Sequence, residues 1–179
     1  MKDIDQRMRK ALTSGQNFRP QYFQLYRACL SNAYDLLYEA DILLKKDCYA
    51  RAYALGFTGA EEIGKALVVA DWIYGLISEQ EFHEAFTKHH TKQTYLENVF
   101  SAIQAEPERD SLSLWGDFIL RMSALYVDKS NNGSPKVPKE CITKESATQM
   151  IDKVQEYLAS IMSAEWLNSP RIGAKALLK

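Results

Sequence analysis

Three charged residues in the middle of an apolar stretch are the first candidates for chemistry. The stretch runs from Arg51 to Trp72, and Glu61, Glu62 and Lys65 stand in it among Ala, Val, Leu and Ile residues. A helix that is apolar on all sides lies inside a protein, and charges are almost never buried there unless they are paired. Glu61 and Lys65 have the spacing of an ion pair on one helix face. The cluster predicts either an anchor that orients a functional group or a structural ion pair at a bundle end.

Gly56, Gly59 and Gly64 lie in the same stretch. Each glycine in a helix costs roughly 0.5–1 kcal/mol relative to alanine. Their presence predicts that a neighbouring backbone or a ligand comes very close to this helix.

A second candidate is the segment FHEAFTKHHTKQ, which holds all three histidines. Counting along the apolar positions Phe82 and Phe86 places His89 on the core side of a helix, with His90 and Lys92 flanking it. A histidine on such a face can act as a general base near neutral pH. The alternative is a hydrogen-bonded core histidine without a catalytic role.

The segment RMSALYVD supplies the third candidate. The planar guanidinium of Arg121 suits a phosphate group, and Tyr126 could donate or accept a proton. A surface salt bridge from Arg121 to Asp117 explains the arginine equally well. Packing explains Tyr126, because it lies on an apolar stripe with Met122.

Neither a metal nor a cofactor is predicted. Paired carboxylates in a bundle are typical of Glu-x-x-His metal sites, but the position three residues after Glu62 is the cation Lys65. His83 and Glu84 do not begin an HExxH motif, and the chain has no Gly-rich phosphate loop and no nucleophile elbow.

The elements that must position these residues are helices. Apolar residues recur with helical spacing, turn formers gather at 128–138, and no β-alternation of useful length occurs. The fold class is therefore predicted as all-α, an antiparallel bundle of about five helices. Ser78 with Glu81, and Thr143, are predicted to cap the third and last helices. The predicted helices cover about 20–46, 47–77, 78–107, 111–127 and 143–168.

The chain is predicted to form one domain. Residues 1–19 are read as an N-terminal arm or short helix, 20–168 as the bundle, and 169–179 as a flexible tail.

Composition points to a soluble protein of the cytoplasm. Lys and Arg total 22 against 23 Asp and Glu, so net charge gives no indication of nucleic-acid binding. Three cysteines without a CxxC pair favour a reducing compartment. No run of eighteen apolar residues predicts a membrane helix.

The order of four segments resembles the AbiV-like abortive infection family, which belongs to the HEPN superfamily of small helical bundles. The segments are LSNAYDLLYEADILL, YARAYALGFTGAEEIGKALVV, FTKHHTKQ and RMSALYVDKSNNG, which is followed by a proline. The resemblance spans roughly residues 27–142, and EEIGKA and ALYVD are its most distinctive pieces.

The resemblance implies a phage-defence protein of the bacterial cytoplasm that forms a homodimer. HEPN proteins are often metal-independent ribonucleases, in which an arginine is followed four to six residues later by a histidine. Here Tyr126 follows Arg121 at that spacing. The implied catalytic set is Arg121 with Tyr126, His89 or His90, and Lys65 and Lys92 would help to bind phosphate.

Two other functions stay open. The chain could be a non-catalytic effector that binds a phage-encoded activator or a protein of the translation machinery. It could also be a helical dimer module whose charged core only sets the register of packing.

Overall fold

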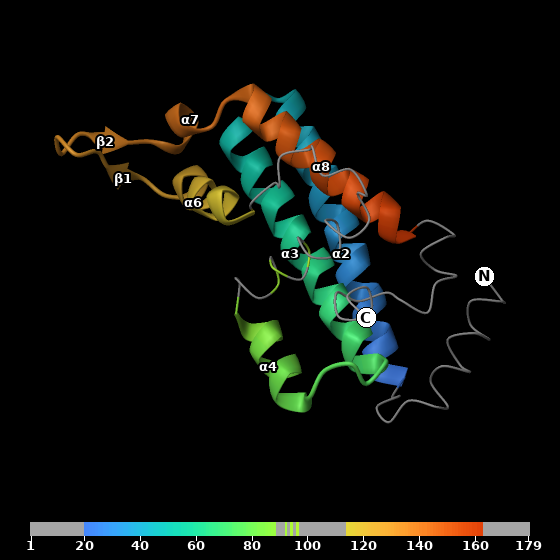
Figure 1. Cartoon of the computed structure of the whole chain (residues 1–179). Coiled ribbons are helices and arrows are strands. Elements are labelled where there is room, and N and C mark those ends of the chain that lie inside the picture. The colour runs from blue at the N-terminus through green and yellow to red at the C-terminus, as the bar shows by residue number, and fades with distance from the viewer. Residues whose placement is uncertain (1–19, 89–91, 93, 95, 97–113, 163–179) are drawn as a thin grey trace, which may run out of the picture.

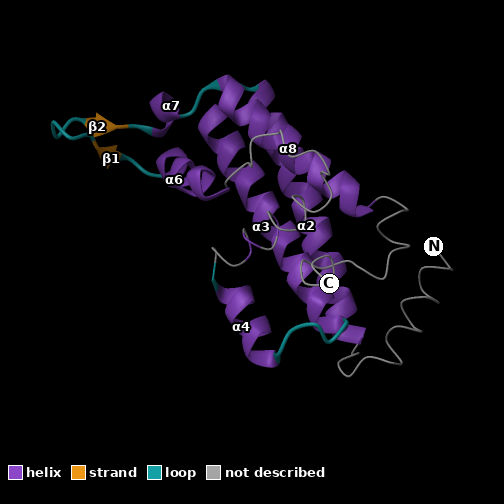
Figure 2. Ribbon diagram, viewed as in Figure 1, coloured by secondary structure: helices purple, strands orange, loops and turns teal. Residues whose placement is uncertain are grey.

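A computed structural model describes residues 20–88, 92, 94, 96 and 114–162. This part of the chain forms six helices and one small two-stranded sheet (Figures 1 and 2). The predicted all-α helical bundle is confirmed, whereas the arm 1–19 and the tail 169–179 lie outside the described residues. The elements are α2 (Pro20–Lys45), α3 (Tyr49–Ile73), α4 (Glu79–Thr87), α6 (Leu114–Leu125), β1 (Asp128–Lys129), β2 (Pro135–Lys136), α7 (Pro138–Cys141) and α8 (Lys144–Met162).

Helix α3 is the centre of the bundle. It runs antiparallel to α2 and packs against α2, α4, α6 and α8 (Figure 1). Nearly all of its residues are buried, from Ala50 to Ile73. Helix α3 is apolar on every side, so a central place in the bundle is favourable because it removes all of these apolar side chains from water. The prediction that this stretch lies inside the protein is confirmed.

The three glycines of α3 face different neighbours. A Cβ atom at Gly56 would meet the Met150 side chain of α8 at 3.2 Å, and one at Gly59 would lie 3.5 Å from the Ala33 carbonyl of α2. At Gly64 a Cβ atom would lie closer than 3.0 Å to the backbone carbonyl oxygen of Lys92. The predicted close approach of a neighbouring backbone is thus observed, and α3 remains one continuous helix.

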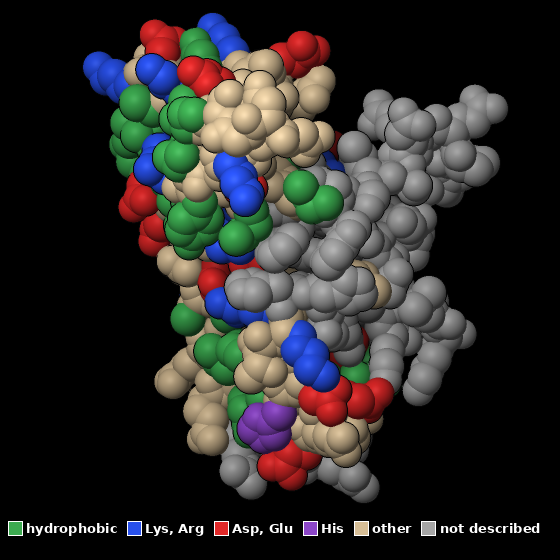
Figure 3. Space-filling view, turned by 90° about the vertical axis from the view of Figure 1, so that its left-hand side faces the viewer, with side chains coloured by type: hydrophobic (Ala, Val, Ile, Leu, Met, Phe, Trp, Pro, Cys, Tyr) green, Lys and Arg blue, Asp and Glu red, His purple; other side chains and the backbone are tan. Residues whose placement is uncertain are grey.

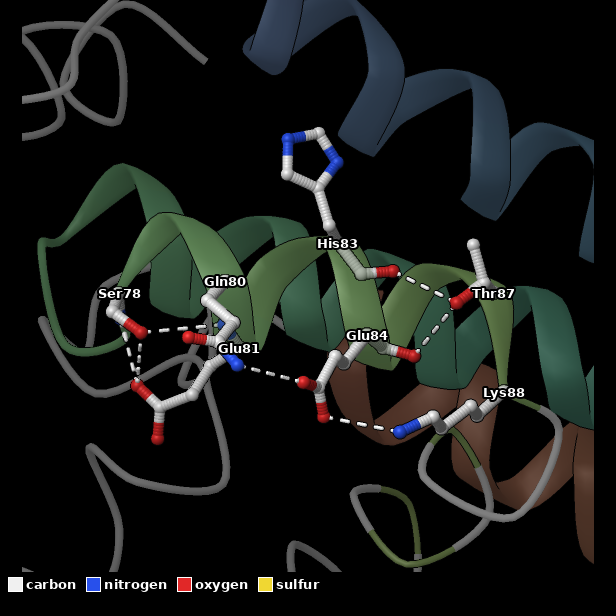
Figure 4. Close-up of polar contacts among 7 residues, drawn as sticks. All are labelled: Ser78, Gln80, Glu81, His83, Glu84, Thr87 and Lys88. Atoms are coloured by element: carbon white, nitrogen blue, oxygen red, sulfur yellow. Dashed lines mark hydrogen bonds and ion pairs between the residues drawn. The ribbon is translucent and has the colours of Figure 1, made fainter.

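Helix α4 starts at the capping box that the sequence predicts. Ser78 Oγ accepts a hydrogen bond from the Glu81 backbone N–H at 3.2 Å, and the Glu81 carboxylate accepts one from the Ser78 N–H at 2.8 Å (Figure 4). Two N–H groups without a helical partner are thereby satisfied. The Phe82 ring of α4 stacks on the Trp72 ring of α3 with centroids 5.1 Å apart, which fixes α4 against the end of α3.

The third helix is shorter than the sequence predicts. Helix α4 ends at Thr87, and Lys88 has an extended backbone, with φ −93° and ψ 122°. Thr87 Oγ1 donates toward the carbonyls of His83 and Glu84, at 3.0 and 3.1 Å (Figure 4). Side-chain bonds of this kind compete with the helical pattern. The prediction of one unbroken helix over 78–107 is therefore wrong at Lys88.

The segment 128–138 forms a small hairpin where the sequence predicts only an exposed loop. Strands β1 and β2 pair antiparallel, with Asp128 opposite Lys136. Gly133 in the turn takes φ +83°, a conformation that glycine adopts at little cost. The hairpin extends away from the bundle and its strand residues are exposed (Figure 1). It buries no apolar face, so it leaves no alternating pattern in the sequence.

Helix α8 begins at the cap that the sequence predicts. The Ser146 backbone N–H donates a hydrogen bond to Thr143 Oγ1 at 3.1 Å. The helix then packs an apolar stripe against α3 and α2. The stripe consists of Ala147, Met150, Ile151, Val154, Tyr157, Leu158 and Ile161.

None of the described helices combines the length and the apolar character needed to span a membrane.

Replacing Gly64 by Ala tests the close approach of Lys92. The new methyl group would overlap a backbone carbonyl, so we expect a loss of about 1–3 kcal/mol in the free energy of unfolding. Gly59→Ala is the matched control, because its methyl group would make ordinary contacts and alanine favours the helix by about 0.5–1 kcal/mol. Urea unfolding of both variants measures the difference. Equal stability of the two variants would contradict the packing.

Candidate functional site

The charged residues of α3 lie inside the bundle. Glu61 is 4% exposed and Glu62 is 9% exposed. Lys65 lies one turn further along α3, is partly buried, and pairs with Glu62. Charges at such depth need partners, because desolvation of an ion costs several kcal/mol. The surroundings of this cluster therefore determine what it can do.

Arg121 of α6 is brought to this cluster from a distant part of the chain. Its Nη1 lies 3.8 Å from Glu61 Oε1, and its side chain is only 17% exposed. The guanidinium Cζ lies 5.3 Å from the centroid of the Phe57 ring, one turn before Glu61 on α3. A weakly hydrated planar cation suits a site between a carboxylate and an aromatic face. The position of Arg121 is thus set by tertiary contacts with α3.

Helix α6 is attached to α3 near the same place. Arg51 Nη1 of α3 donates a hydrogen bond to the carbonyl oxygen of Leu125, at 3.4 Å. Ala124 is fully buried in the core cluster that also contains Phe57. These contacts hold the last turn of α6 over α3 and keep Arg121 next to Glu61.

Lys92 completes the cluster. Lys92 is only 5% exposed, and its backbone lies against Gly64 of α3. The pKa of Lys92 lies below its usual value, chiefly because burial disfavours the ammonium ion, and next because of the Lys65 charge. The charges of Glu61 and Glu62 act in the opposite direction, and that of Arg121 lowers the pKa further. Lys92 therefore interacts with every other charge of the cluster.

These five residues form what we term the charged cluster. Its members are Glu61, Glu62, Lys65, Lys92 and Arg121. Three cations and two carboxylates give the cluster a formal charge of +1 when all are ionised. This charge favours the binding of an anion. Arg121 Nε is buried and has no hydrogen-bond partner among the residues that the structure describes. A buried donor of this kind is a position where a phosphate oxygen could accept a hydrogen bond.

The ion pairs differ from the simplest prediction. Sequence spacing favours a pair between Glu61 and Lys65, but Lys65 pairs with Glu62, three residues before it, and Glu61 faces Arg121. Spacings of three and four residues both allow contact on a helix. Arg121 arrives by tertiary packing, which no helical spacing reveals. Arg121 is largely buried against α3 instead of lying on the surface, while the side chain of Asp117, its other predicted partner, lies outside the described part of the structure.

Tyr126 lies on the surface of the molecule. Tyr126 is 59% exposed, and its neighbours Ile119, Met122 and Val127 are also exposed. The prediction that the apolar stripe of α6 packs into the core is therefore wrong for Ile119, Met122 and Tyr126. Arg121 and Ala124 point to α3, whereas Ile119, Met122, Tyr126 and Val127 stay on the surface.

The two remaining catalytic candidates, His89 and His90, lie outside the described residues. His83 is described and is exposed on α4, 3.8 Å from Glu79. Among the described residues, no group of three or more His, Cys, Asp or Glu side chains could hold a metal ion.

Cys29 of α2 borders the cluster. Burial, followed by the charge of Glu62, raises the pKa of its thiol to about 11. The thiol therefore stays protonated at neutral pH and is a poor nucleophile. It serves as an apolar neighbour of Glu62 on the α2 side.

Phe57 is a residue of the site that sequence reasoning did not single out. Its ring is fully buried and lies beneath the Arg121 guanidinium. The sequence feature that could have pointed to Phe57 is its position four residues before Glu61, which places both residues on one face of α3. Its partner on α6 could not be read from that spacing.

Comparison with known protein families gives one match. A family model described as AbiV matches residues 21–159, which include α2, α3, α4, α6, the hairpin and most of α8. Comparisons with curated proteins and with solved structures found no match. The matched region covers most of the chain and contains all five residues of the charged cluster. The chain therefore belongs to the AbiV family of HEPN proteins.

Proposed function

We propose that the protein is an abortive-infection effector of the bacterial cytoplasm that cleaves RNA without a metal ion at the charged cluster. Membership of the AbiV family supports a role in phage defence. Ribonuclease activity is supported by the position of Arg121. Its guanidinium lies against Glu61 and Phe57, shares its cluster with two lysines, and keeps one buried donor without a partner in the described part of the chain.

The reaction needs positive charge near a phosphate. The RNA 2′-hydroxyl loses its proton and attacks the adjacent phosphorus, and the bond from phosphorus to the 5′-oxygen breaks as that oxygen gains a proton. Negative charge develops on the phosphate oxygens in the transition state, and positioned cations stabilise it. Arg121 would act on this charge, while Lys65 and Lys92 would bind neighbouring phosphate oxygens.

The reaction also needs a group that takes a proton from the 2′-hydroxyl and one that gives a proton to the leaving 5′-oxygen. His89 and His90 precede Lys92 by three and two residues in the sequence, and a segment of three residues reaches at most about 11 Å. A histidine at either position is therefore tied by the chain to the Lys92 side of the cluster. An imidazole suits the role because its pKa lies near neutrality. Tyr126 is the other candidate for this role.

We further propose that the exposed apolar face of α6 is a homodimer interface. We term this the α6 face: it consists of Ile119, Leu120, Met122, Tyr126 and Val127, all exposed. Figure 3 views the molecule from the side of α6 and the hairpin and shows hydrophobic side chains gathered in its upper half. A patch of this kind is typical of a protein interface, and identical patches on two copies make a symmetric contact.

A non-catalytic effector is the second candidate. The observation that favours it is the hairpin 128–136, which extends away from the bundle (Figure 1). A projecting, exposed element is a ready contact for a phage-encoded activator or a protein of the translation machinery. In this case the charged cluster would only stabilise the packing of α6 on α3.

RNA cleavage by variants of Arg121 tests the ribonuclease. We expect wild-type protein to cleave cellular RNA in the presence of EDTA and Arg121→Ala to lower the rate by about 100-fold or more, because a positioned donor to the transition state is lost. Arg121→Lys should retain an intermediate rate, since it keeps the charge and loses the planar fork. His89→Ala, His90→Ala and Tyr126→Phe identify the group that moves the proton.

Circular dichroism and thermal unfolding are measured on the same samples, because loss of Arg121 also leaves Glu61 with one cation fewer. Equal cleavage by wild type and Arg121→Ala, or no cleavage by wild type, would exclude catalysis at this cluster.

Met122→Glu tests the dimer. A charge in the α6 face should weaken self-association by about 10-fold or more, which analytical ultracentrifugation over a range of concentrations measures. Ile42→Glu is the matched control, because Ile42 is exposed to the same degree, 42% against 43%, and lies on α2. An equal effect of both substitutions, or a wild type that stays monomeric, would exclude the α6 face as the dimer contact.

Affinity capture tests the non-catalytic alternative. Full-length protein in infected cells should retain a specific partner, and shortening of the hairpin by replacing Ser130–Ser134 with Asn-Gly should abolish that retention. Capture that is unchanged by the shorter hairpin, or the absence of a specific partner, would count against binding at this element.

A further inference from the structure

A groove runs between α2 and α8 and shares no residue with the charged cluster or the α6 face. Its volume is about 320 Å³. Leu37 and Leu158 form its buried floor, whereas Tyr34, Tyr38 and Met162 are exposed along it. Exposed apolar side chains gain free energy when they are covered, in proportion to the area removed from water. The groove is therefore favourable for an occupant with an apolar surface of its own.

The two helices line the groove with the same spacing. On α2 the lining residues start at Tyr34 and end at Asp41, and on α8 they start at Gln155 and end at Met162. Each set occupies the positions i, i+3, i+4 and i+7, which form one face of a helix over about 10 Å. The helices run antiparallel (Figure 1), so Asp41 lies at the Gln155 end. Two such faces side by side form the kind of groove that accepts a third, amphipathic helix.

The stretches of α2 and α8 that border the groove are acidic. Residues 34–45 and 152–162 carry five carboxylates and two lysines. Asp41 lines the groove, and the exposed Lys45 pairs with it. The second lysine, Lys153, is partly buried. The carboxylates of this side of the bundle thus outnumber its cations.

Two of these carboxylates stand at the α8 edge of the groove. Asp152 precedes the lining residue Gln155 by three positions, and Glu156 precedes the lining residue Ala159 by three positions. This spacing places both carboxylates next to the lining face, and both residues are exposed. An edge with one sign of charge attracts a partner with the opposite sign.

The charge of this edge also disfavours other occupants. Nucleic acid and an anionic membrane surface carry the same sign of charge as the edge. A second copy of the chain, related by a two-fold axis, would bring identical carboxylates together, and like charges across an interface are costly. A cationic partner avoids this repulsion.

We propose that the groove binds an amphipathic helix of a partner protein, with Lys or Arg residues on both sides of its apolar stripe. The stripe would cover Leu37 and Leu158 and contact Tyr34, Tyr38 and Met162. The alkyl stems of the basic residues would pack against the tyrosine rings, and their cations would face the carboxylates of the edge. This inference does not rest on ribonuclease activity.

Binding of a synthetic helix to the full-length protein tests the proposal. The probe is a fluorescein-labelled peptide of about five helical turns, built from Leu on one face and Lys on the other, and fluorescence anisotropy measures its binding. We expect the double substitution of Tyr34 and Tyr38 by Ala to weaken binding by about 10-fold or more. Asp152→Lys with Glu156→Lys should also weaken it by about 10-fold, and this effect should shrink as the salt concentration rises.

Two control variants match these substitutions. Tyr126→Ala removes a tyrosine of similar exposure from another surface, since Tyr126 is 59% exposed and Tyr38 is 62% exposed. Glu140→Lys reverses an exposed charge on α7. Both controls should bind the peptide as the wild type does. Circular dichroism of every variant confirms that its helical content is unchanged.

Four results would overturn the proposal. The first is a wild type that does not bind the peptide, and the second is equal binding of a peptide with Glu in place of Lys. The third is a loss of binding in the variants that does not exceed the loss in their controls, because the peptide would then lie elsewhere. The fourth is self-association that the double tyrosine substitution abolishes in analytical ultracentrifugation without peptide, because a second copy would then occupy the groove.

Discussion

The contact between Glu61 and Arg121 sets the arrangement of the other charged groups. Glu61 lies in a helix whose surface is apolar on nearly every side, and an ionised carboxylate at that depth is tolerated only with a compensating charge. Arg121 supplies it from α6, with its guanidinium also placed on the Phe57 ring. Beside this contact Glu62 pairs with Lys65, and the charge of Lys92 is influenced by all four of these groups. A change at this contact would therefore alter the electrostatic environment of the whole cluster.

Close packing around α3 makes this arrangement possible. Gly56 and Gly59 admit α8 and α2, and Gly64 admits the backbone of Lys92. A side chain at Gly64 would move Lys92 away from the carboxylates, so the glycine contributes to the site although it carries no functional group. Interiors at this packing density do not deform freely, and the charged side chains are consequently held by the same contacts that stabilise the bundle.

Several features of the fold could be predicted from local signals. The caps at Ser78 and Thr143 are short-range hydrogen bonds, and the structure forms both. The break at Lys88 was missed because the apolar stripe of Phe82 and Phe86 carries no information about the hydroxyl of Thr87. The apolar stripe of α6 was assigned to the core, yet Met122 and Tyr126 are exposed. Periodicity identifies an apolar face, but it does not say whether another part of the same chain covers it.

The sequence alone determined that α3 is a central helix with charges inside it, since its apolar residues cover every face and leave no side for water. It also determined the residue types available for chemistry. Only the tertiary structure decided that Arg121 reaches Glu61, that Lys92 lies against Gly64, and that Tyr126 remains on the surface. Spacing along a helix specifies contacts within one or two turns, whereas contacts between distant segments depend on how whole helices pack, which no local pattern records.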